Sequence, residues 1–146
     1  MARVLIDADG CPVVDETLRL CRKTGTECTL LCDTAHVFEK EGAVTVTVSK
    51  GADSVDFALV NLVRPGDIVV TQDYGLAAMC LARRARPISQ DGMLYTAENI
   101  DGLLAARHTA RQIRDAGGRL RGQKARRPEQ NKAFAQALEQ LLAAKP

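Results

Sequence analysis

Short apolar runs alternate along the chain with segments whose apolar residues recur at helical spacing. The apolar runs are rich in Val, Ile and Leu, as is typical of strands, and they cover residues 3–7, 26–32, 43–48, 67–71 and 86–89. The helical pattern covers residues 12–22, 52–63, 76–84, 100–116 and the chain from 128 onward. Because strands and helices alternate, the sequence predicts an α/β fold: a three-layer α/β/α sandwich with a mostly parallel central sheet. We expect residues 1–146 to form a single domain.

The segment after residue 96 combines a long helix with a polar connection. Thr96 and Asn99 are typical of a helix start, and Leu103, Leu104 and Ile113 are expected to face the core. The pair Gly117-Gly118 ends the helical pattern. Residues 117–127 have almost no apolar side chains, which predicts a mobile basic loop before the last helix.

Aspartates gather where the predicted strands end. Asp7 and Asp9 follow the first apolar run, and Asp73 follows the fourth. Asp53 and Asp56 lie in the first turn of the helix that precedes the fourth strand. If the strands are parallel neighbours, their carboxyl ends meet at one edge of the sheet, where open α/β folds bind ligands. We therefore take Asp7, Asp9, Asp53, Asp56 and Asp73 as candidate catalytic residues.

A carboxylate cluster of this kind predicts a bound divalent cation. Several carboxylates at one edge repel each other unless a cation neutralises them. Oxygen-only ligands favour Mg²⁺ or Mn²⁺ over Zn²⁺. Such an ion can activate water and stabilise the charge that develops on a phosphate.

Each aspartate also has a purely structural interpretation. An acid in the first turn of a helix is favoured by capping and by the helix dipole, which would explain Asp53 or Asp56. Asp9 and Asp73 are also plausible turn residues, and Asp67, after Gly66, is assigned to a turn and left out of the site. The combination of the acids, rather than any one of them, supports a functional site.

The charge of the chain is small overall but unevenly distributed. Net charge is +2 over 146 residues, yet residues 107–127 contain eight basic side chains and a single acid. Such an asymmetry indicates a polyanionic partner. The candidate nucleic-acid-binding residues are Arg107, Arg111, Arg114, Arg119, Arg121, Lys124, Arg126 and Arg127.

Other features of composition limit the choice of function. The five cysteines form no C-x-x-C motif, which argues against a zinc knuckle or a redox pair. No apolar run approaches the roughly 20 residues that span a bilayer, and no signal peptide is evident, so a cytoplasmic protein is expected. The sequence leaves a homo-oligomer open.

Three functions fit these residues. The first is a metal-dependent nuclease that hydrolyses RNA phosphodiesters with metal-activated water. The second is a phosphatase, because Asp7-Ala8-Asp9-Gly10 resembles the opening motif of haloacid-dehalogenase-like phosphatases, which implies Asp7 as the nucleophile; Cys11 stands where that motif has Thr. The third is nucleic-acid binding without catalysis, although an aromatic fraction of 3% argues against a stacking platform for single strands.

The whole set of motifs resembles one family. The set comprises Asp7-Ala8-Asp9, Cys11-Pro12, Gly51-x-Asp53-x-x-Asp56, Gly66-Asp67-Ile68-Val69-x-Thr71-x-Asp73, Leu76-Ala77 and Tyr95-Thr96. Together these residues are similar to the YaiI/YqxD family of uncharacterised bacterial proteins. The resemblance implies a fold similar to PIN domains, whose members are often Mg²⁺- or Mn²⁺-dependent ribonucleases.

The resemblance also implies particular ligands. It gives Asp7, Asp53, Asp56 and Asp73 as metal ligands, with Asp9 close by. The chain departs from the family pattern near its end, where it reads Arg121-Gly122-Gln123 and Asn131-Lys132 in place of Gly-Gly-Pro and Asp-Arg.

Overall fold

A five-stranded parallel sheet forms the centre of the protein in a computed structural model that describes residues 2–33, 40–51, 54–118 and 125–144. The strands are β1 (Val4–Asp7), β2 (Cys28–Asp33), β3 (Val44–Val48), β4 (Ile68–Val70) and β5 (Arg86–Ile88), in the order β3-β2-β1-β4-β5. All four neighbouring pairs are parallel. The predicted sheet is therefore confirmed, and it is parallel throughout.

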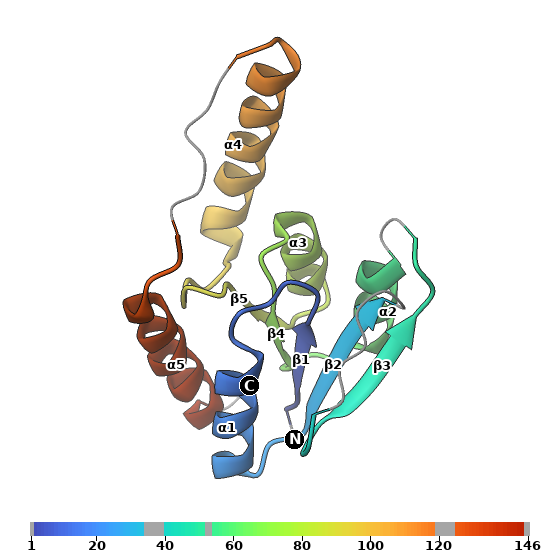
Figure 1. The fold of residues 1–146 in the computed structure, drawn as a ribbon, viewed down its shortest axis with the longest axis vertical. Helices are drawn as coiled ribbons and strands as arrows, with labels where there is room; N and C mark the ends of the chain where they lie inside the picture. Colours follow the sequence, from blue (N-terminus) through green and yellow to red (C-terminus); the bar gives the residue numbers. More distant parts are fainter. Residues whose placement is uncertain (1, 34–39, 52–53, 119–124, 145–146) are drawn as a thin grey trace.

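Helices cover both faces of the sheet (Figure 1). The helices are α1 (Val14–Thr24), α2 (Ser54–Leu62), α3 (Tyr74–Ala82), α4 (Ala97–Asp115) and α5 (Pro128–Ala143). Helices α1 and α5 pack together on one face, and α2 and α3 lie on the other. The result is the predicted three-layer α/β/α architecture.

The central strand β1 shows why a buried parallel strand is apolar at successive positions. Side chains alternate across a strand, so Val4 and Ile6 enter the core beneath α1 and α5, whereas Leu5 enters the core beneath α2 and α3. All three are completely buried. A parallel sheet covered on both faces needs apolar residues at successive positions, as the sequence pattern indicated.

The strand order reverses between β1 and β4. From β1 the chain proceeds outward through β2 to β3, and it then returns to β4 on the other side of β1. Val4, Leu5 and Ile6 pair with Ile68, Val69 and Val70. Ligands of open α/β sheets bind outside the carboxyl ends of the strands at such a point, which is where Asp7 and Asp73 lie.

Helix α4 projects beyond the carboxyl edge of the sheet (Figure 1, yellow to orange). Its first turns pack on α3 through Ile100, Leu103 and Leu104, but its distal half is exposed except at the half-buried Ala110. Ile113, predicted to face the core, is instead 39% exposed, because the helix has left the body of the protein before this residue. None of the helices in the described ranges is long and apolar enough to cross a membrane.

Most element boundaries lie within two residues of the prediction, and the differences have local causes. Helix α3 begins at Tyr74 rather than at residue 76, because the Asp73 side chain caps it. Helix α1 begins at Val14, and Pro12 lies before the helix rather than in its first turn. The predicted loop at 117–127 falls mainly on residues outside the described ranges.

Candidate functional site

A hydrogen bond joins the ends of the two central strands. The Thr71 hydroxyl donates to Asp7 Oδ2 at 2.9 Å and accepts the backbone N–H of Asp73 at 3.0 Å. The Tyr95 hydroxyl donates to the carbonyl of Thr71 at 3.0 Å. Thr71 is fully buried, so it fixes both the direction of the Asp7 carboxylate and the start of the turn that carries Asp73.

Asp7, Asp9 and Asp73 form what we call the acidic edge, at the carboxyl ends of the strands. Asp73 connects this edge to the projecting helix α4. Its Oδ1 accepts the backbone N–H of Leu76 at 3.1 Å, which caps α3. The same oxygen lies 3.5 Å from Nη1 of Arg107 on α4. Asp73, whose structural interpretation from the sequence was a turn residue, thus caps α3, and its carboxylate also lies within reach of the Arg107 guanidinium.

Asp9 lies at the junction of β1 and β2. Its Oδ2 accepts the backbone N–H of Asp33 at 3.0 Å. The bond ties the loop after β1 to the end of β2, so Asp9 helps to shape the edge.

The environment of Asp7 opposes its ionisation. Burial raises the pKa of the Asp7 carboxyl above its ordinary value; the hydrogen bond from Thr71 lowers that pKa, and the charges of Asp73 and Asp9 raise it again. Asp73 and Asp9 are therefore both close enough to repel the Asp7 carboxylate. Neutralising this repulsion is what a bound cation would do, and carboxylate oxygens are suitable ligands for a hard divalent ion.

Asp56 approaches the same region from α2. Burial raises the pKa of the Cys80 thiol to about 12, and the charges of Asp56 and Asp7 both contribute to that rise. Both carboxylates thus lie near the buried Cys80 thiol. Asp53, the remaining predicted ligand, is outside the described residues, and within the described ranges no three His, Cys, Asp or Glu side chains form a group that could hold a metal.

A row of arginines on α4 continues from the acidic edge. Arg107, Arg111 and Arg114 line a groove of about 290 Å³. Arg107 and Arg114 also line an adjoining groove of about 610 Å³ that contains Asp7 and Asp73. The structure thus brings Arg107 and Arg114 to the acids and places Arg111 in the adjoining groove; Arg119, Arg121 and Lys124 lie outside the described residues.

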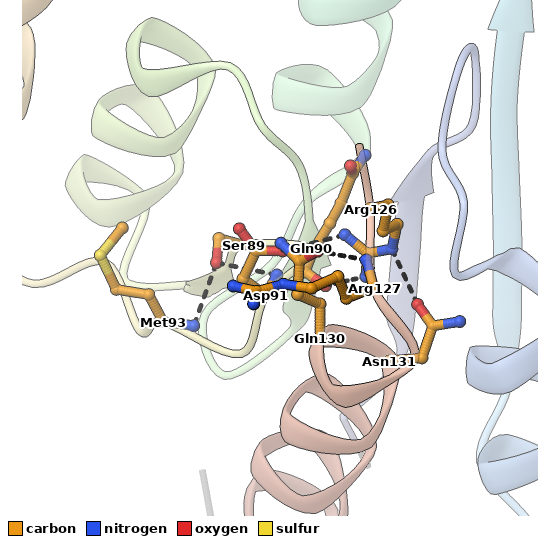
Figure 2. Close-up of polar contacts among 8 residues, drawn as sticks. All are labelled: Ser89, Gln90, Asp91, Met93, Arg126, Arg127, Gln130 and Asn131. Carbon is orange, nitrogen blue, oxygen red and sulfur yellow. Dashed lines mark hydrogen bonds and ion pairs between the residues drawn. The ribbon is translucent and has the colours of Figure 1, made fainter. Parts of the chain in front are cut away.

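Arg126 makes contacts within the protein (Figure 2). Its guanidinium donates to Asn131 Oδ1 at 2.8 Å, to Asp91 Oδ1 at 2.9 Å and to the carbonyl of Gln90 at 2.7 Å. These bonds join the turn after β5 to the start of α5. The neighbouring Arg127 is exposed and lines a pocket together with Arg126.

Several residues at this edge were not identified from the sequence. Gln72 and Tyr74 line the groove that contains Asp7, and Thr71 holds Asp7 in place. The available signal was their position in the turn Thr71-Gln72-Asp73-Tyr74, directly after a strand that ends at the site. Gln90 carried no comparable signal, because it reaches the edge from β5.

The sequence of the chain matches known proteins along nearly its whole length. Residues 5–144 match the sequence profile of the uncharacterised YaiI/YqxD family. Similar chains include a UPF0178 protein of Exiguobacterium sibiricum, 54% identical over 98% of both chains, and one of Ruminiclostridium cellulolyticum, 44% identical over 99% of this chain and 93% of the relative. A third, from Staphylococcus haemolyticus, is 39% identical over 97% of this chain and 98% of its own length.

No solved structure matches the chain. Among the described residues, the family profile covers all ten helices and strands except the first residue of β1, and it includes every described residue of the acidic edge. The chain belongs to the YaiI/YqxD family.

Proposed function

We propose that the protein is a divalent-metal-dependent nuclease that hydrolyses RNA phosphodiesters. One observation carries the proposal: Asp7, Asp73, Arg107 and Arg114 line a single groove. Phosphodiester hydrolysis needs acids to hold a metal and cations to hold the backbone. The groove places acidic and basic side chains next to each other.

Within this proposal the acids hold Mg²⁺ or Mn²⁺. Asp7 and Asp73 are the ligands at the carboxyl edge, and Asp56 and Asp53 are the proposed ligands from the segment around the start of α2. The ion, when bound, supplies an activated water and stabilises charge on the phosphate. Thr71 keeps the Asp7 carboxylate directed along the edge through its 2.9 Å hydrogen bond.

The arginine row favours a polymer over a small phosphate ester. Arg107, Arg111 and Arg114 are spaced so that they share one face of α4. A helix rises about 1.5 Å per residue, so Arg107 and Arg114 lie roughly 10 Å apart along it. That span suits successive phosphates of one strand, whereas a phosphatase substrate would need only the contacts next to Asp7.

The test is cleavage of labelled single-stranded and structured RNA in Mn²⁺, Mg²⁺ or EDTA. Wild-type protein is expected to cut in either metal and not in EDTA, and Asp7→Asn is expected to abolish cutting. Asp101→Asn is the matched control, because Asp101 is exposed on the part of α4 outside the groove.

Two results would contradict the proposal. RNA cleavage that persists in Asp7→Asn would show that the acidic edge is not the catalytic centre. Folded wild-type protein that binds RNA without cutting it in either metal would leave binding alone as the function.

A further inference from the structure

A second pocket adjoins the groove of the acidic edge. It has a volume of about 420 Å³ and is lined by Asp9, Gly10, Gln72, Tyr74, Gln90 and Asp91; we call it the edge pocket. Gln72 and Tyr74 line both the edge pocket and the groove that contains Asp7. The volume is within the range of about 300–1,000 Å³ that is usual for small-ligand pockets.

The lining of the edge pocket does not suit a phosphate. Asp9 and Asp91 present carboxylates, and the arginines lie outside it, on α4 and near the start of α5. The exposed Gln72 amide offers both a donor and an acceptor, whereas the nearly buried Gln90 side chain already hydrogen-bonds the Cys11 thiol and offers only its remaining amide atoms. A flat, neutral group with several hydrogen-bonding atoms fits this combination better than an anion does.

The aromatic wall of the edge pocket is held rigidly. Tyr74 and Tyr95, the only two tyrosines in the sequence, meet edge to face with ring centroids 5.9 Å apart. The Tyr95 hydroxyl is fixed by its bond to the carbonyl of Thr71. Tyr95 therefore packs against the Tyr74 ring and restricts its movement. The Tyr74 ring is available for stacking at the junction with the groove.

The wall formed by the turn after β5 is also preorganised (Figure 2). The Ser89 hydroxyl accepts the backbone N–H groups of Asp91 at 3.2 Å and Met93 at 3.0 Å, which fixes the turn. Arg126 donates to the Gln90 carbonyl and to Asp91, and Gln130 donates to Asp91 at 3.1 Å. Walls fixed before binding lose little freedom when a ligand enters.

We infer that the edge pocket binds an unpaired nucleobase of the strand whose phosphate lies at Asp7 and Asp73. The inference rests on the proposed nuclease function. Gln72 and Gln90 contact the hydrogen-bonding edge of the base, and Tyr74 stacks on its face. A base inside a duplex has its pairing edge and both faces occupied, so the inference specifies single-stranded RNA as the substrate.

The test measures binding without cleavage. Wild-type protein in EDTA is titrated with the four ribonucleoside monophosphates, and with ribose 5-phosphate as the ligand that lacks a base. The readouts are dissociation constants and the NMR signals of the Gln72 and Gln90 side-chain amides. We expect nucleotides to bind about tenfold or more tightly than ribose 5-phosphate, as base stacking on an aromatic ring normally provides, and to shift both amide signals.

Gln72→Ala, at an exposed position, is expected to reduce this preference for nucleotides, whereas Gln136→Ala on the exposed side of α5 leaves it unchanged. Equal affinity for ribose 5-phosphate and the nucleotides, or amide signals that do not move, would overturn the inference even if RNA is cleaved. Base-dependent binding by a protein that cuts no RNA would support the edge pocket and refute only the hydrolysis.

Discussion

The Thr71 hydroxyl donates a hydrogen bond to the Asp7 carboxylate at 2.9 Å, although 64 residues separate the two in the sequence. The bond crosses from β4 to β1 at the point where the strand order reverses. It partly offsets the burial and the neighbouring charges that raise the pKa of Asp7. Asp7 is thus held in a defined direction at a position where its charge is unfavourable in the metal-free protein.

Asp7→Asn is expected to stabilise the metal-free protein at neutral pH while it removes cleavage. The substitution takes away a partly buried charge next to Asp73 and Asp9, and the Asn carbonyl can still accept from Thr71. Thermal denaturation in EDTA should therefore give a higher midpoint for Asp7→Asn than for wild type. Asp101→Asn, as the control, should change the midpoint little.

The difference in denaturation midpoint between Asp7→Asn and wild type should become smaller as pH is lowered. Because the pKa of Asp7 is raised in the folded state, the folded protein binds a proton more tightly than the unfolded chain does. The contribution of Asp7 to the free energy of unfolding of the wild type therefore falls as pH rises from the unfolded pKa through the folded pKa. The advantage of Asp7→Asn should shrink as pH is lowered through that window, and an advantage that grows instead would contradict this account.

The arginine row is expected to determine the salt dependence of RNA binding. Each phosphate contact to a single strand contributes a slope of about −0.7 in a plot of log K against log salt. Replacing Arg107, Arg111 and Arg114 by Gln should therefore make the slope smaller by about 2. Fluorescence anisotropy with labelled RNA measures this, and Arg19→Gln on the exposed side of α1 provides the control. An unchanged slope would show that the RNA phosphates do not contact these three arginines.

Arg126→Gln is expected to destabilise the fold, whereas Arg127→Gln is not. The first substitution removes the charge-assisted bond to Asp91 and leaves the Gln90 carbonyl without its donor. Losses of this kind typically lower the free energy of unfolding by about 1.5–3 kcal/mol, against at most about 0.5 kcal/mol for an exposed side chain such as Arg127. Urea denaturation of both variants measures the difference, and equal stabilities would show that the Arg126 contacts contribute nothing.

Two glycine-to-alanine variants should have opposite effects. Gly92 has φ of +90°, and an added Cβ would lie 2.7 Å from the carbonyl oxygen of Ala133 on α5, so Gly92→Ala should lower stability by roughly 1–3 kcal/mol. Gly102 lies within α4 with open space around it, and Gly102→Ala should raise stability by about 0.8–1 kcal/mol through helix propensity. Chemical denaturation measures both; a neutral Gly92→Ala would mean that the turn can move away from α5.

The core of the fold was predictable from local pattern. The run from Val4 to Ile6 is apolar at every position, which is typical of a parallel strand buried on both faces. Asp7 and Asp73 were expected to end neighbouring strands, and the pairing of β1 with β4 confirms this. The assignment of Asp67 to a structural role agrees with its bonds to Arg3 and Arg64 at the other end of β4.

The contacts that depend on distant segments were not predictable. Arg126 was expected to bind nucleic acid, because its sequence neighbours are basic; its bond to Asp91 depends on a turn 35 residues away. Ile113 has the helical spacing of a core residue, and nothing local indicates that α4 has left the body of the protein by that point. The Tyr74–Tyr95 contact likewise arises only when α4 and α3 pack together.

The strand order has a consequence for how the protein is made. During synthesis, Asp7 leaves the ribosome early, but its partner Thr71 and the groove residues Arg107 and Arg114 follow much later. The last helix, α5, supplies Phe134 and Leu138, which are both fully buried in the core beneath α1 and α5. A nascent or truncated chain therefore lacks both the assembled acidic edge and part of its core, so we expect the site to be complete only after the C-terminal helix has docked.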